Sequence, residues 1–208
     1  MTIEKNDPRS SREAAECLSK GGIAILPTDT VYGFSGIADI KGQVKLSTDR
    51  LIRRIKGRGE DKPFIHLISS PEEISSYTDD RIPAGLLALW PGPLTIIVHI
   101  KENSPLDTDL KTVAFRCPGD KWLRELIARA GRPVYSSSVN RSGSPVLQSI
   151  SDIEKEFAEE AALIVRDGDK TGSLPSTIVS VEGGAVKVIR QGALKVPASL
   201  TAANAACP

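Results

Sequence analysis

The feature that most constrains this sequence is a short apolar run, residues 23–26, that stops abruptly at a proline and a group of polar residues. From Gly21 to Gly33 the chain reads GGIAILPTDTVYG. An apolar run of this length between turn signals is typical of a buried strand, and ligands of α/β proteins bind at such strand ends. Because Pro-Thr-Asp also forms ordinary turns, this segment alone does not decide between a turn and a binding loop.

Helical and strand patterns alternate along the rest of the chain, which predicts the α/β fold class. Gly183 and Gly184 separate the last two predicted strands and indicate a hairpin, so we expect a mixed sheet with flanking helices. One domain is expected over residues 1–195 and a loose C-terminal tail over 196–208. The predicted helices cover residues 8–20, about 46–57, a segment from 70 onward, 82–90, 120–130 and 151–157, and the predicted strands cover 23–26, 64–68, 94–100, 113–116, 134–136, 163–165, 177–181 and 186–190.

Three of the predicted helices carry further local signals. Ser10 and Glu13 have the spacing of a capping box. Ser70 precedes a first-turn proline and two acidic residues, which indicates a strong helix start. In the helix at 120–130 the spacing predicts an inward face made of Trp122, Leu123, Ile127 and Ala128.

The composition restricts the classes of function. The 208 residues carry a net charge of +1, so the chain has no overall field that would attract nucleic acid or a membrane surface. Three widely spaced cysteines, Cys17, Cys117 and Cys207, favour reduced thiols over a disulfide framework or a zinc site. No apolar stretch approaches the roughly 18 residues of a membrane span. We therefore expect a cytoplasmic protein without a metal cage.

A cluster of cations occupies the predicted helix end at residues 53–63, which reads RRIKGRGEDKP. Cations at a helix C-terminus complement the helix dipole, and this accounts for any single one of them. Gly57 and Gly59, however, let the backbone leave the helix and place Lys56, Arg58 and Lys62 on one flexible turn. Such a turn suits the binding of a polyphosphate.

Polar side chains also mark four other predicted strand ends. Thr112 and Arg116 share one face of a predicted strand, because alternate residues of a strand point the same way. The segment 136–143, SSSVNRSG, either forms a plain turn or offers a run of donors to phosphate oxygens. Ser176 stands at the start of a later strand and Arg190 at the end of the last one. A bound nucleotide would depend on such groups, because the chain has no Walker A, GxGxxG or kinase sequence.

The two histidines, His66 and His99, limit the reaction types. Neither has a nucleophilic serine or cysteine motif beside it, so a hydrolase triad is poorly supported. His99 alternates with isoleucine and valine, which is typical of a residue on a sheet face. The cations and hydroxyls fit displacement at phosphorus, where positioning and charge stabilisation need no protein nucleophile.

Taken in order, these segments resemble the YrdC-like threonylcarbamoyl-AMP synthase family. No single motif is decisive, but their order and spacing from about residue 21 to 192 are specific. The resemblance implies a single domain with a twisted mixed sheet, flanking helices and a large concave basic cleft. The similar motifs are PTDTVYG at 27–33, KGR at 56–58, KP at 62–63, WPGPLT at 90–95, RCP at 116–118, SVNRSG at 138–143, PSTI at 175–178 and RQG at 190–192.

The resemblance also implies an activity. Members of the family join L-threonine, bicarbonate and ATP into threonylcarbamoyl-AMP with release of pyrophosphate, and the product serves tRNA threonylcarbamoyladenosine modification. The implied partners are tRNA or double-stranded RNA and the tRNA threonylcarbamoyl-transferase machinery, and no membrane. ATP is a substrate, and Mg²⁺ is expected to bind through its phosphates, because no carboxylate pair for the ion is obvious in the sequence.

Position by position, the resemblance assigns residues to two ligands. L-threonine would be bound by Thr30, Arg116, Ser138 and Ser176, with Arg116 on its carboxylate. ATP would be bound by Lys56, Arg58, Lys62, Thr112, Asn140, Gln148 and Arg190. Lys56 and Arg58 are the expected catalytic residues.

The chain departs from the family pattern at three places. The histidine that the family often carries after the Lys-Pro step is displaced by one residue, so that Leu67 takes its position and His66 precedes it. Gln148 stands where a small hydroxyl residue is common. The stretch 40–48 is several residues longer than expected and is predicted to form a loop over the cleft.

Two other functions stay open on the sequence alone. An RNA- or nucleotide-binding paralogue without synthase activity would agree with the shifted His66 and with Gln148. A different ATP-using transferase with another amino acid or amine as acceptor would use the same motifs, since the sequence does not define a side-chain pocket.

Overall fold

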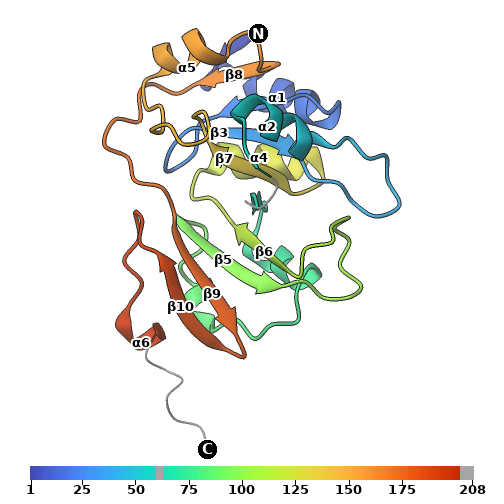
Figure 1. Ribbon diagram of the computed structural model, residues 1–208, viewed down its shortest axis with the longest axis vertical. Coiled ribbons are helices and arrows are strands. Elements are labelled where there is room, and N and C mark those ends of the chain that lie inside the picture. Colours follow the sequence, from blue (N-terminus) through green and yellow to red (C-terminus); the bar gives the residue numbers. More distant parts are fainter. Residues whose placement is uncertain (60–62, 202–208) are drawn as a thin grey trace, which may run out of the picture.

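The computed structural model describes residues 1–59 and 63–201, and these form one ten-stranded sheet with helices around it (Figure 1). The strand order is β1-β8-β2-β3-β7-β4-β6-β5-β9-β10. The strands are β1 (Thr2–Glu4), β2 (Ala24–Leu26), β3 (Gly33–Ile37), β4 (Ile65–Leu67), β5 (Leu94–His99), β6 (Thr112–Arg116), β7 (Val134–Ser138), β8 (Leu163–Arg166), β9 (Thr177–Glu182) and β10 (Ala185–Arg190). The helices are α1 (Ser10–Ser19), α2 (Thr48–Lys56), the 3₁₀ helix η1 (Pro71–Ser76), α3 (Ala84–Leu87), α4 (Lys121–Ala130), α5 (Ile150–Phe157) and α6 (Ala198–Thr201).

The sheet is mixed, as predicted. Four strand pairs are parallel, namely β1 with β8, β2 with β8, β4 with β6 and β5 with β9. The pair β9–β10 is the expected antiparallel hairpin, with Gly183 and Gly184 at its turn. The two glycines have positive φ angles of 58° and 87°, a backbone conformation that residues with a side chain rarely adopt.

Helices cover both faces of one half of the sheet. On one face α1 and α4 pack together, and Leu18 and Leu123 belong to the same buried cluster as Leu26 of β2. On the other face Ile52 of α2 and Phe157 of α5 join the cluster that contains Phe34 of β3. Figure 1 shows these helices gathered around β3, β7 and β8, while β5, β9 and β10 form the other end of the molecule. The middle strands β4, β6 and β7 therefore lie between two differently covered regions.

Two helix boundaries follow the sequence signals closely. Gly57 ends α2 in the left-handed conformation, with φ at 61°. The Asp120 carboxylate accepts a hydrogen bond from the Leu123 amide at 3.1 Å and so caps α4. At η1 the predicted helix start is confirmed, with Ser70 and Glu73 forming a capping box, although the segment is a 3₁₀ helix.

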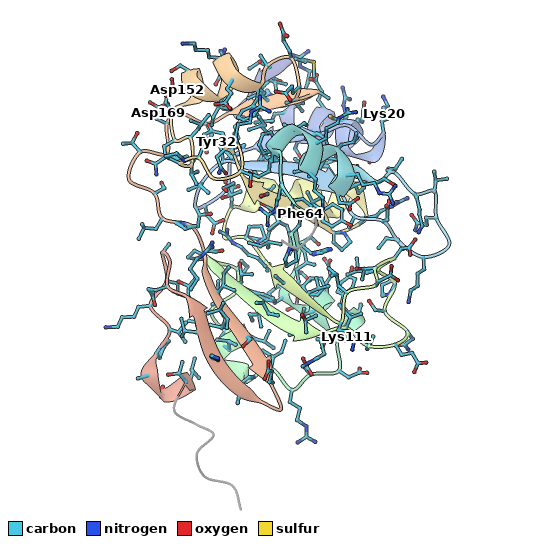
Figure 2. The ribbon with its side chains drawn as sticks, in the orientation of Figure 1. Lys20, Tyr32, Phe64, Lys111, Asp152 and Asp169 are labelled. Atoms are coloured by element: carbon cyan, nitrogen blue, oxygen red, sulfur yellow. The ribbon has the colours of Figure 1, made fainter. Side chains whose placement is uncertain are left out.

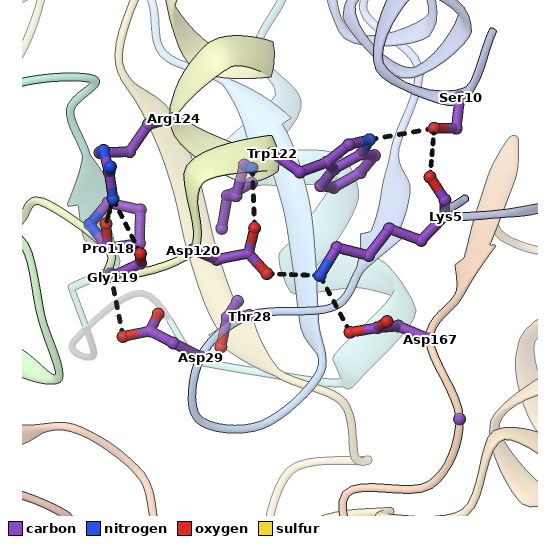
Figure 3. Close-up of polar contacts among 12 residues, drawn as sticks. Lys5, Ser10, Thr28, Asp29, Pro118, Gly119, Asp120, Trp122, Arg124 and Asp167 are labelled. Atoms are coloured by element: carbon purple, nitrogen blue, oxygen red, sulfur yellow. Dashed lines mark hydrogen bonds and ion pairs between the residues drawn. The ribbon is translucent and has the colours of Figure 1, made fainter. Parts of the chain in front are cut away.

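Other local predictions are wrong. Ser10 does not cap α1, because its hydroxyl donates to the Lys5 carbonyl and accepts from the Trp122 indole (Figure 3). The inward face of α4 includes Leu126, whereas Ala128 is exposed and Trp122 half-buried, because Trp122 lies towards Ser10 at the edge of α1. The helix expected over 82–90 is limited to α3. The prediction for His99 is confirmed, because it lies at the exposed end of β5, paired with Thr112, and its amide donates to Asp80.

The sequence patterns missed β1 and β3. β3 reads GFSGI, and its small residues resemble a turn more than a strand. They are needed for close packing, because a Cβ atom on Gly36 would lie 2.6 Å from the Thr48 hydroxyl and one on Gly33 2.9 Å from the Ser136 hydroxyl. β3 pairs with both β2 and β7, and it thereby fixes the two ends of the 27–32 loop.

Three further expectations concern the C-terminal tail, the cysteines and membrane spans. Val196 is buried and α6 packs against β10 inside the predicted tail, so the division at residue 195 stays a prediction. Residues 202–208, with Cys207, lie outside the described residues. Cys17 and Cys117 are free thiols. Within residues 1–59 and 63–201 no helix has the length and apolarity that a membrane crossing requires.

Candidate active site

A pocket of about 230 Å³ opens where β4, β6, β7 and β9 carry side chains to one face of the sheet. We call it the anion pocket, because three guanidinium groups and six serine or threonine hydroxyls line it and, among residues 1–59 and 63–201, no carboxylate does. It is lined by Thr28, Thr30, Val31, Tyr32, Arg58, Pro63, Ile65, Arg116, Ser136, Ser137, Ser138, Val146, Pro175, Ser176, Ile178 and Arg190.

Arg116 is the most deeply buried cation of the anion pocket, with 4% of its surface exposed. Its Nε donates to the Gly92 carbonyl at 3.1 Å, one Nη to the Thr30 hydroxyl at 2.9 Å and the other to the Asp29 carboxylate at 2.6 Å. Burial lowers the pKa of Arg116, and the negative charge of Asp29 opposes that shift. A guanidinium has five N–H groups, so two remain to grip an anion in the pocket.

The 27–32 loop between β2 and β3 is held by its own hydroxyls and by Asp29. The Thr28 hydroxyl donates to the Val31 carbonyl at 2.7 Å and accepts from the Thr30 amide at 3.0 Å. Asp29 accepts from the Gly119 amide at 2.9 Å, which joins the loop to the turn before α4 (Figure 3). Thr30 therefore faces the anion pocket from a loop with little freedom.

The opposite side of this loop is also anchored. The Tyr32 hydroxyl donates to the Gly168 carbonyl at 2.8 Å and accepts from the Asp167 amide at 2.7 Å, and Figure 2 shows Tyr32 in the neighbourhood of Asp169. Asp167 in turn accepts from Lys5, which also pairs with Asp120 at 2.6 Å (Figure 3). Ion pairs outside the pocket thus support the wall that carries Thr30.

Arg58 and Arg190 also line the pocket, Arg58 from the segment after α2 and Arg190 from the end of β10. Arg58 donates to the Ser137 hydroxyl at 3.1 Å, and Arg190 donates to the Ser176 carbonyl at 2.8 Å. The pKa of Arg190 is lowered, first by partial burial and then by the positive charge of Arg116. Like charges kept this close favour an anionic ligand that neutralises them.

Lys56 lies beneath the pocket rather than in its lining. It is 2% exposed, and its ammonium donates to the Ser138 carbonyl, to the Asn140 carbonyl at 3.0 Å and to the Asn140 side chain at 2.9 Å. Burial, followed by the charge of Arg58, lowers the pKa of Lys56 to about 7. Lys56 therefore shapes the loop after β7, and its three donors are all used by that loop.

Asn140 and Gln148 also make internal hydrogen bonds. The Asn140 amide donates to the carbonyls of Arg141 and Ser144, both at 2.8 Å. Gln148 accepts from the Gly172 amide at 2.9 Å and donates to the Ser173 carbonyl at 3.3 Å. Neither residue lines the anion pocket.

Of the predicted site residues, the anion pocket brings six together: Thr30, Arg58, Arg116, Ser138, Ser176 and Arg190. Thr112 is exposed at the start of β6, about 13 Å along the strand from Arg116. Lys62 lies outside the described residues. The roles of Thr112, Lys56, Asn140, Gln148 and Lys62 towards ATP stay predictions.

Sequence reasoning missed several residues of the pocket. Thr28 and Ser136 belong to motifs that were recognised, and the strand period would have placed Ser136 on the same face as Ser138. Ile65 and Ile178 form an apolar part of the pocket wall. They were missed because only the polar residues near them were considered as ligand contacts. His66 lies on the opposite face of β4 from Ile65, so its side chain does not line the anion pocket. The loop at 40–48 also lines a different pocket, on the face of His66.

A mixed α/β sheet that carries a polar pocket with two arginines at strand ends and a third after α2 defines an anion-binding α/β protein. The family model Sua5/YciO/YrdC, described as telomere recombination, matches residues 16–192. The chain therefore belongs to the Sua5/YciO/YrdC family.

Similar proteins agree with this family. A threonylcarbamoyl-AMP synthase of Pyrococcus abyssi is 32% identical over 189 residues, which are 88% of this chain and 54% of the relative. One of Pseudoalteromonas translucida is 28% identical over 188 residues, 87% of this chain and 98% of the relative. The crystal structure of P. abyssi Sua5 complexed with L-threonine superposes with a TM-score of 0.79 at 26% identity, covering 92% of this chain and 57% of the other. The chain thus spans about half the length of the archaeal relative.

Proposed function

We propose that this protein is an L-threonylcarbamoyladenylate synthase, a nucleotidyltransferase that acts on L-threonine, bicarbonate and ATP. The observation that carries the proposal is the convergence of Arg58, Arg116 and Arg190 on one pocket, whose described lining residues include no carboxylate. All three substrates bring negative charge to such a pocket, as carboxylate, bicarbonate and triphosphate. The names of the relatives and the L-threonine complex of P. abyssi Sua5 support the same reaction.

We assign L-threonine to the deep end of the anion pocket. Its carboxylate would accept from the two N–H groups of Arg116 that are not engaged elsewhere in the described part of the chain. Thr30, Ser138 and Ser176 would bind its polar groups from three sides. The Ser176 hydroxyl lies 2.8 Å from that of Thr95, which holds it in place.

In the proposed reaction the amine of threonine and bicarbonate first give a carbamate with loss of water. A carbamate oxygen then attacks the α-phosphorus of ATP, the bond from this phosphorus to the bridging oxygen breaks, and pyrophosphate leaves with that electron pair. Arg58 and Arg190 would stabilise the charge that collects on the leaving group. Lys62, Thr112, Asn140 and Gln148 stay the further proposed contacts of ATP, and Lys56 would act by holding the loop at 138–140.

A magnesium ion would enter with ATP. The lining of the anion pocket contains no carboxylate, and no cluster of three metal-ligating side chains occurs within residues 1–59 and 63–201. These residues do not form a protein site for the ion, so the phosphates would carry it. We also propose a cytoplasmic setting, in which Cys17 and Cys117 stay reduced, and transfer of the product towards tRNA by a separate transferase.

The test measures pyrophosphate release by the purified chain. Release is expected with L-threonine, bicarbonate and ATP together, and it should be absent when any one of them is omitted. Arg116→Lys should raise the KM for threonine, because a lysine cannot make the bidentate contact. Steeply salt-dependent RNA binding without pyrophosphate release would favour the RNA-binding paralogue instead. Release with another amino acid in place of threonine would indicate a different transferase.

A further inference from the structure

A second cavity, with a volume of about 420 Å³, lies behind the anion pocket. We call it the back pocket. Ile65 and Ser136 line the anion pocket, while the next residue of β4, His66, and the preceding residue of β7, Tyr135, line the back pocket. Because successive residues of a strand point to opposite faces, the two pockets share the walls β4 and β7 from opposite sides.

The unusually long 40–48 stretch builds one wall of the back pocket. Ile40 forms a bridge with Leu106, and the Lys41 amide donates to the Pro105 carbonyl at 2.8 Å. Lys45 pairs with Asp107 at 2.7 Å, and both line the cavity. The stretch therefore does not cover the anion pocket but joins the 105–110 segment on the other face of the sheet.

The floor of the back pocket contains a buried histidine with an unsatisfied nitrogen. His66 is 3% exposed, and its Nδ1 has no hydrogen-bond partner among the described residues. Its ring stands edge-on to Tyr135 at 4.8 Å between centroids, and Phe64, which Figure 2 labels, lies 5.6 Å from Tyr135 between centroids and completes an aromatic floor. The floor therefore offers aromatic rings to an apolar part of a ligand.

The charges of the back pocket differ from those of the anion pocket. Four carboxylates, of Asp39, Asp49, Asp107 and Asp109, and three cations, of Lys45, Arg50 and Arg53, line it. This balance gives phosphate groups no net attraction. It provides partners for a ligand that carries one charge of each sign.

Several of these charges are already engaged. Asp39 accepts from the amides of Leu46 and Ser47, and Asp107 pairs with Lys45. The side chains of Asp49, Arg50 and Asp109, in contrast, make no hydrogen bond or ion pair with the residues that the structure describes. One cation and two carboxylates at the rim, above the aromatic floor, could therefore bind a ligand.

We propose that the back pocket is a second ligand site, for a small zwitterion of the α-amino acid class. Asp49 and Asp109 would accept from the ammonium group, Arg50 would donate to the carboxylate, and the side chain of the ligand would pack against the aromatic floor. A ligand in this site would contact β4 and β7, the same strands that carry Ile65 and Ser136 to the anion pocket.

Calorimetric titration of the full chain with each of the twenty free amino acids tests the proposal. The Arg116→Ala variant removes the proposed threonine contact, so binding to it reports a second site. At least one amino acid should bind this variant at 1:1 stoichiometry, and adding Asp49→Asn and Arg50→Gln should weaken that binding at least tenfold. The matched control adds Asp7→Asn and Arg9→Gln, an exposed pair elsewhere, and should leave the affinity unchanged.

Amide hydrogen exchange of the unaltered chain supplies a readout that does not depend on Arg116→Ala folding. The bound amino acid should protect residues 45–50 and 107–110. The proposal is overturned if no amino acid binds or protects these segments, if binding survives Asp49→Asn with Arg50→Gln, or if inorganic phosphate or a nucleoside protects them while amino acids do not.

Discussion

The guanidinium of Arg116 and the carboxylate of Asp29 form an ion pair of 2.6 Å that joins β6 to the 27–32 loop. The Arg116 side chain is only 5% exposed, so it depends on this partner for charge compensation. The other oxygen of Asp29 accepts from the Gly119 amide at 2.9 Å. Asp29 is therefore a positioning residue, which aims Arg116 into the anion pocket.

Replacing Asp29 with asparagine should change the orientation of the Arg116 side chain more than it changes the fold. We expect the KM for L-threonine to rise about tenfold with a smaller change in kcat, and the free energy of unfolding to fall by about 1–3 kcal/mol, because a hydrogen bond to a buried charge is lost. Steady-state kinetics and urea unfolding measure the two effects. Asp7→Asn, which removes an exposed partner of Arg9, is the control and should change neither. An unaltered KM for threonine in Asp29→Asn would contradict the positioning role.

Arg190→Ala should lower kcat/KM for ATP by about 100-fold, the size of effect seen when one preorganised donor to developing charge is removed. Arg190→Lys should restore part of the loss, because it returns the charge without the planar fork. The variant chain should unfold at the same denaturant concentration, since Arg190 makes a single hydrogen bond to the residues that the structure describes, to the Ser176 carbonyl. Full activity in Arg190→Ala would remove Arg190 from the proposed ATP contacts; Arg12→Ala, on the exposed side of α1, serves as the comparison.

The activity should depend on the protonation of Lys56. Burial lowers its pKa to about 7, so the ammonium form with three donors prevails below that pH. Above it the neutral amine has two N–H groups for three oxygens of the 138–140 loop. The rate of pyrophosphate release should therefore fall as the pH rises through about 7. In Lys56→Met the rate should be low throughout and this limb should vanish; a limb that persists in Lys56→Met would assign it to another group.

The stability of the protein should fall in mild acid because of His66. Burial lowers the pKa of His66 to about 4, from an ordinary value of 6.5. Between these values the unfolded chain binds a proton that the native protein does not, so the free energy of unfolding decreases as the pH falls from about 6.5 to about 4, by up to about 3 kcal/mol. Urea unfolding of His66→Leu should lack this decrease, whereas His99→Leu, at an exposed strand end, should keep it. Equal slopes in the original chain and in His66→Leu would contradict this.

Much of the fold follows from local patterns. Strands such as β5 and β8 are apolar runs between turn signals, and α2 and α4 end at glycines in the left-handed conformation. β3 was not predictable in the same way. Its glycines are needed because Thr48 and Ser136 pack closely against them, and these two residues are distant in the sequence. Close approach between remote segments has no local signature.

The site residues also divide into predictable and unpredictable ones. Arg116 and Ser176 lie at strand ends, which the sequence patterns indicate. Lys56 reads as an exposed cation at a helix end, yet the structure buries it under the carbonyls of Ser138 and Asn140. Which partner a long side chain meets depends on how the loop after β7 folds back over α2, and the spacing of residues does not encode that path.

The two pockets lie on opposite faces of β4. The number of residues before this strand therefore decides, as much as their identity does, which side chains face each pocket. Inserting one residue between Pro63 and Ile65 would shift the strand by one position, so that the imidazole now facing the back pocket would face the anion pocket instead. Two homologous chains with the same amino acids in this segment can therefore differ in their active-site chemistry through length alone.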